Sequence, residues 1–119
     1  MKQITNLNER RERYLRDALP VRLGGLAANL ARVKSFSRNA ANGDAVFQLL
    51  DESKHFIDWS RNEADIDVLV RLREIQKQVS IWQLHWDANW SSEDIRFEMA
   101  SESAKWSSEI ILKSGLLDQ

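Results

Sequence analysis

The chain has 119 residues, enough for one domain with a buried core, and a formal net charge of −1. It contains no cysteine, which excludes disulfide bonds, thiolate metal ligands and cysteine catalysis. No apolar run follows Met1, and none reaches the roughly 18 residues that a membrane span needs, so we expect a cytoplasmic protein without a secretory signal or membrane segment.

The first predicted helix begins near Asn6, which can act as its N-cap. Glu9 follows three positions later, as in a capping box. Pro20 then interrupts the helical pattern, because proline lacks a backbone N–H and its ring clashes with the preceding turn. We predict a kink or a break at Leu19–Pro20, with Pro20 in the first turn of the following helix.

The segment from Pro20 to about Ser37 predicts an amphipathic helix. Its large apolar residues recur every three or four positions and form one stripe: Leu23, Leu26, Leu30 and Val33. A strip of small residues lies beside it: Gly24, Ala27, Ala28 and Ala31. Small side chains allow close helix packing, and we favour a contact within the monomer. The alternative is a self-complementary homodimer patch at Gly24, Ala28 and Ala31.

Three more helices are predicted downstream, over residues 44–59, 61–89 and 92–114. Asp44 and Ser91 stand at the expected N-cap positions, and residues 37–43 are predicted to form a loop. Gly115 follows the last helix, where a left-handed residue often ends a helix.

A tight turn is predicted within the polar segment 58–65, where Ser60 and Glu63 match a capping box. The alternative is a continuous helix of about 45 residues, because the apolar period persists through this segment. Such a helix would be about 68 Å long at 1.5 Å per residue, too long for a compact domain of this size.

These elements predict an all-α fold. One proline and four glycines are too few for a turn-rich β fold of this length. Short loops favour antiparallel neighbours, so we expect a single domain over residues 1–119. Its predicted architecture is an antiparallel up-and-down bundle of four main helices, the first kinked or broken at Pro20.

Five tryptophans are present, and three of them, Trp82, Trp86 and Trp90, step by four and share a face at the end of the predicted helix 61–89. An aromatic stripe at helical spacing usually belongs to a core, which is the interpretation we favour. One alternative is an interface around Trp86 and Trp90. Another is a small-molecule pocket lined by Trp82 and Trp86.

Charge is unevenly distributed along the chain. Residues 1–38 carry nine Lys/Arg and three Asp/Glu, a net charge of +6, whereas residues 39–119 carry eight and fifteen, a net charge of −7. Arg10 and Arg11 are therefore candidate nucleic-acid contacts. Arg13 and Arg16 each have a glutamate four residues earlier, so we favour a solvated helix face over a nucleic-acid surface.

The sequence contains no nucleophile elbow, phosphate-binding loop or dinucleotide fingerprint. Glu52 and His55 have the Glu-x-x-His spacing of di-iron bundles, but that chemistry needs two such motifs and two further glutamates. We predict no metal, no cofactor and no enzymatic activity. The favoured function is a protein–protein interaction or regulatory module that binds a protein partner or a second copy.

Three segments carry a family resemblance: RRERYLRDALP (residues 10–20), RLGGLA (residues 22–27) and ESKHFIDW (residues 52–59). Around them, most of the chain resembles a small family of cyanobacterial all-helical proteins whose function is not known. The resemblance implies a cyanobacterial, cytoplasmic protein. It brings no activity and no site residues.

Overall fold

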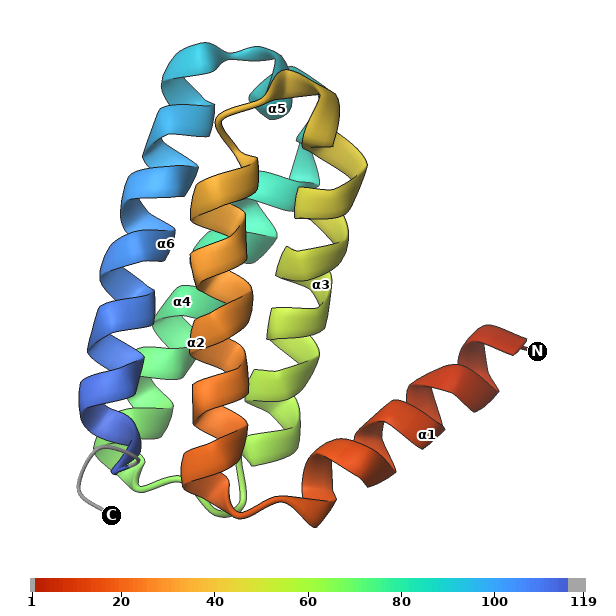
Figure 1. Ribbon diagram of the computed structural model, residues 1–119, viewed down its shortest axis with the longest axis vertical. Coiled ribbons are helices and arrows are strands. Elements are labelled where there is room, and N and C mark those ends of the chain that lie inside the picture. Colours follow the sequence, from red (N-terminus) through yellow and green to blue (C-terminus); the bar gives the residue numbers. More distant parts are fainter. Residues whose placement is uncertain (1, 116–119) are drawn as a thin grey trace.

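The computed structural model describes residues 2–115, and side chains from Asn6 onward. This part of the chain is helical and contains no strand, which confirms the all-α prediction. Its elements are α1 (Lys2–Arg16), α2 (Leu19–Phe36), the 3₁₀ helix η1 (Ala40–Asn42), α3 (Gly43–Ser60), α4 (Ile66–Leu84), α5 (Trp86–Ser91) and α6 (Glu93–Ser114). The four longest helices, α2, α3, α4 and α6, lie side by side, and α1 projects away from them (Figure 1). None of the helices in the described range has the length and apolarity needed to cross a membrane.

The core lies between the four long helices. The predicted stripe on α2 is fully buried, and side chains from α3, α4 and α6 complete the core: Leu23, Leu26, Leu30, Val33, Val46, Leu50, Ile57, Leu72, Ile75, Val79, Trp82, Met99, Trp106 and Ile110. Burying one such aliphatic side chain is worth about 1.5–3 kcal/mol. The buried side chains follow the predicted three- and four-residue spacing, although α4 carries a second apolar side that lies outside the core.

The break between α1 and α2 lies at Asp17 and Ala18, slightly before the predicted position. Ala18 has an extended backbone (φ −64°, ψ 153°), and the chain changes direction there. Pro20 lies in the first turn of α2, where its missing N–H breaks no helical hydrogen bond. The predicted start of α1 is wrong, because the helix already begins at Lys2 and Asn6 lies inside it.

The turn between the third and fourth helices is confirmed. Helix α3 ends at Ser60 and α4 begins at Ile66, so one continuous helix is excluded. The predicted capping box is wrong. The Ser60 hydroxyl donates to the carbonyl of Phe56 within α3, and Asp65 takes the N-cap position of α4.

The predicted helix over residues 61–89 is divided by a break at His85, which has φ −125° and ψ 60°. The Asn89 side chain donates a 2.8 Å hydrogen bond to the carbonyl of Trp82, which satisfies a group left free by the break. A periodic pattern of apolar residues does not reveal this hydrogen bond. The predicted helix end at residue 89 therefore lies after the observed end of α4 at Leu84.

Two of the predicted N-caps are also wrong. Asp44 lies in the first turn of α3, and Ser92 rather than Ser91 caps α6 by accepting a hydrogen bond from the backbone N of Ile95. The C-terminal prediction is confirmed, since Gly115 ends α6 with φ +80°.

Candidate interaction surfaces

Trp82 belongs to the core, as favoured from its spacing. Its ring lies 5.3 Å from that of Trp106, and both residues are buried. The Trp82 Nε1 donates to a carboxylate oxygen of Glu98 at 3.4 Å, so the one polar atom of the indole has a partner. The two tryptophans line a shallow groove of about 380 Å³ between α4 and α6.

Trp86 and Trp90 lie on α5 and are half-buried. Their rings stack at 5.3 Å, and Phe47 of α3 meets Trp86 edge-on at 5.4 Å. Trp82 and Trp86 therefore pack against different partners. Both residues pack against the core, and α5, which carries them, lies at one end of the bundle (Figure 1).

The small-residue strip of α2 is divided between two environments. Ala27 is buried beneath α6, where the Ser107 hydroxyl donates a 2.8 Å hydrogen bond to the Ala27 carbonyl. Gly24 is half-buried, whereas Ala28 and Ala31 are exposed. Only Ala27 thus makes the fully buried intramolecular contact, because the strip is wider than the face that α6 covers.

Tyr14 anchors α1 to the rest of the molecule. Its ring stacks on Phe56 at 4.1 Å and lies 5.8 Å from Trp59. Its hydroxyl donates to the carbonyl of Arg22 at 3.0 Å. Burial raises the pKa of Tyr14 to about 12, although the hydrogen bond with Ser60 and the charge of Arg22 act in the opposite direction.

The arginines of α1 have different partners. Arg10 lies 3.7 Å from a carboxylate oxygen of Glu52, so part of its charge is compensated. Arg11, Arg13 and Arg16 are exposed, and none has a carboxylate within 4 Å among the described side chains. The predicted acidic partners of Arg13 and Arg16 are therefore not engaged.

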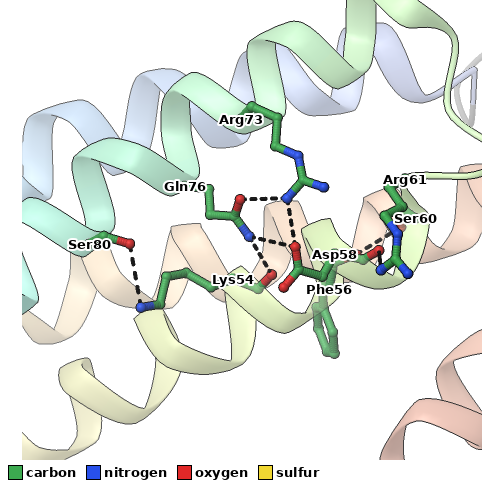
Figure 2. Close-up of polar contacts among 8 residues, drawn as sticks. All are labelled: Lys54, Phe56, Asp58, Ser60, Arg61, Arg73, Gln76 and Ser80. Carbon is green, nitrogen blue, oxygen red and sulfur yellow. Dashed lines mark hydrogen bonds and ion pairs between the residues drawn. The ribbon is translucent and has the colours of Figure 1, made fainter.

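A polar network joins α3 to α4 (Figure 2). The Asp58 carboxylate accepts hydrogen bonds from Arg73 at 2.6 Å and from Gln76 at 3.1 Å. Partial burial raises the pKa of Asp58, but these hydrogen bonds and the charges of Arg73 and Arg61 outweigh it, and the net pKa is lowered. These contacts join side chains of α3 to side chains of α4, so we interpret this network as a cross-link between the two helices.

Glu52 and His55, which have the Glu-x-x-His spacing, both contact protein side chains. His55 stacks on Trp59 at 5.4 Å, and Glu52 accepts a 2.9 Å hydrogen bond from Asn29. No group of three or more His, Asp or Glu side chains is placed to hold a metal between Asn6 and Gly115.

A basic groove of about 570 Å³ lies between the C-terminal half of α2 and the N-terminal half of α6. The exposed Phe97 contributes to its lining. Four cationic side chains surround it: Lys34, Arg38, Arg96 and Lys105. Arg96 is committed elsewhere, since it donates to the Trp90 carbonyl at 2.6 Å, and Lys105 pairs with Glu102 at 3.5 Å.

Four of the eight exposed large apolar side chains in the described part of the chain lie on the outer face of α4. Its exposed large side chains are Ile66 (70%), Val70 (55%), Ile81 (51%) and Leu84 (74%). The opposite side of the same helix faces the core through Leu72, Ile75, Val79 and Trp82. We define the outer α4 face as Ile66, Val70, Glu74, Lys77, Ile81 and Leu84.

The outer α4 face was not predicted from the sequence, because the core stripe of the same helix has the same three- and four-residue spacing. The sequence does contain the pattern, since Ile66, Val70, Lys77, Ile81 and Leu84 also follow helical spacing.

Comparison of the chain with protein-family models, with curated proteins and with solved structures gave no match.

Proposed function

We propose that this chain is a non-enzymatic protein–protein interaction module that binds its partner through the outer α4 face. The observation that carries the proposal is that four large apolar side chains are at least half exposed on one side of one helix. Single exposed apolar residues are ordinary on protein surfaces, but four large apolar side chains on one side of one helix are typical of a contact surface.

The chemistry of this face supports a helix-to-helix contact. The apolar side chains cluster near both ends of α4, and the charged Glu74 and Lys77 lie between them. Covering the apolar clusters would remove them from water, while the central charges would fix the register of the partner. A substrate pocket would instead require concave walls around a reacting group.

The proposed scaffold is an antiparallel up-and-down bundle of four helices in a cytoplasmic protein. In Figure 1 the colour order along α2, α3, α4 and α6 alternates in direction from one helix to the next, which supports this architecture. The absence of cysteine is compatible with a reducing compartment.

The experiment is site-specific photo-crosslinking in cells. A photoreactive amino acid replaces Val70 or Ile81 on the outer α4 face, and Glu93 on α6 serves as the exposed control. We expect covalent protein adducts from positions 70 and 81 and none from position 93. Absence of adducts at both α4 positions, in a protein that remains folded by circular dichroism, contradicts the proposal.

Nucleic-acid binding by α1 is the second candidate. It is favoured by Arg11, Arg13 and Arg16, which are exposed and have no carboxylate within 4 Å among the side chains that the structure describes, on a helix that projects away from the bundle (Figure 1). Arg10 would contribute more weakly because of Glu52. Filter binding at low and high salt tests it: binding at low salt that is lost on replacing Arg11 and Arg13 by Gln supports it, and no binding at low salt contradicts it.

A further inference from the structure

We infer that the partner of the outer α4 face is a second copy of this chain, packed with its α4 antiparallel to the first. The inference rests on the proposed function and names its partner. It follows from the order of apolar and charged residues along the face, which reads similarly in both directions.

The register of the proposed dimer is given by that order. A two-fold axis between residues 75 and 76 places Val70 level with the partner's Ile81, because the two residues lie equally far from the axis along α4. Ile66 then lies within one residue of the level of the partner's Leu84, an axial offset of about 1.5 Å. All four exposed apolar side chains of each copy thereby face apolar side chains of the other.

The charges in the middle of the face select the antiparallel arrangement. The same axis places Glu74 level with the partner's Lys77, so two oppositely charged pairs form across the interface. In a parallel dimer in register, Glu74 would face a glutamate and Lys77 a lysine. Both side chains are available, since that of Glu74 is 60% exposed with only a 3.9 Å contact to Arg71, and Lys77 is exposed.

A second copy fits better than an unrelated helix because the outer α4 face is complementary to itself, both in its apolar positions and in its charges. Two-fold homodimers are the commonest protein oligomers, and their interfaces must be self-complementary in this way. One helix of 19 residues contributes from each copy, so the contact is about 28 Å long. An interface of this size predicts a dimer that dissociates on dilution.

Charge reversal tests the central pairs. We expect Glu74→Lys and Lys77→Glu each to weaken dimerisation about three- to tenfold in sedimentation equilibrium, because each turns two attractive pairs into repulsive ones. The double variant E74K/K77E restores the pairs and should dimerise like the original chain. Glu93→Lys makes the same charge change on α6 and should have no effect.

Disulfide crosslinking tests the direction, since the chain has no cysteine of its own. Mixing the V70C and I81C variants under mild oxidation should give a disulfide-linked dimer. V70C alone should not crosslink, because its two sulfurs would lie about 16 Å apart along the axis. The antiparallel arrangement would be overturned if V70C formed a disulfide efficiently with a second V70C chain and the mixture gave no disulfide between V70C and I81C.

The failure of this inference is distinguishable from failure of the proposed function. A chain that stays monomeric at all concentrations, but forms photo-adducts from positions 70 and 81 with other proteins, overturns self-association and keeps the interaction module. A chain that stays monomeric and forms no adducts overturns both. Dimerisation unaffected by either single charge reversal overturns the register.

Discussion

The indole of Trp90 lies directly over Gly43, the first residue of α3. A Cβ atom built on Gly43 would meet the Trp90 Nε1 at 2.8 Å. The same nitrogen donates a 2.7 Å hydrogen bond to the carbonyl of Ala40, and the ring stacks on Trp86. Gly43 has an ordinary helical backbone (φ −53°), so the space it leaves, rather than its flexibility, lets α5 approach the connection between α2 and α3.

Replacing Gly43 by Ala should therefore destabilise the fold despite the better helix propensity of alanine. The added methyl group forces Trp90 to move and break its hydrogen bond, so we expect a loss of about 1–2 kcal/mol in the free energy of unfolding. Urea denaturation followed by tryptophan fluorescence measures it. Gly25→Ala is the matched control, because nothing lies within 4 Å of its added Cβ, and it should stabilise by about 0.5–1 kcal/mol. Stabilisation by both substitutions would contradict the packing.

The docking of α1 can be followed through the pKa of Tyr14, because the chain has a single tyrosine. Absorbance titration of the folded chain should give Tyr14 a pKa of about 12, against about 10 in the unfolded chain. Because the folded pKa is raised, the stabilisation is fully present below pH 10 and is lost as the pH rises through 12. Tyr14→Phe should abolish this alkaline loss and cost about 1 kcal/mol at neutral pH through the hydrogen bond to Arg22. A titration midpoint near 10 would show that α1 does not stay docked.

Arg22 and Glu63 form an ion pair with unequal exposure. The Arg22 side chain is 2% exposed and that of Glu63 is 51% exposed, and the Nη1 of Arg22 is buried without a hydrogen bond. Removing the Glu63 carboxylate leaves the buried Arg22 cation without its charged partner. Removing Arg22 leaves the Glu63 carboxylate, which is already in contact with water. We expect Glu63→Ala to cost about 2 kcal/mol and Arg22→Met about 1 kcal/mol in urea denaturation. Asn62→Ala in the same turn is the control, and the opposite order would refute the argument.

Glu109 should make the fold sensitive to acid. Two hydrogen bonds from Arg71, at 2.6 and 3.0 Å, join α4 to α6 and lower the pKa of Glu109, although partial burial acts against them. Because the folded pKa is lowered, this stabilisation is present above about pH 4.5 and is lost as the pH falls below it. Glu109→Gln should reduce the acid-dependent loss of stability measured by urea denaturation from pH 7 to pH 3.

Local chemistry accounts for what the sequence predicted correctly. The leucine stripe of α2, the turn after Ser60 and the left-handed Gly115 each depend on spacing or backbone preferences within a few residues. The helical class follows from the same periodicity. Errors at helix ends, such as Asp44, arose where several nearby polar residues could serve as caps and only the surrounding packing selects one.

The order of residues is enough to predict that the chain is helical and which residues share a face of each helix. Which of these faces are covered depends on how the helices pack together. Helix α4 has apolar residues on both sides, and its neighbours bury Leu72 and Val79 while Val70 and Ile81 remain outside. The spacing of residues fixes the direction of each side chain around its own helix axis. Burial depends on where the other helices lie, and the packing of the whole core sets their positions.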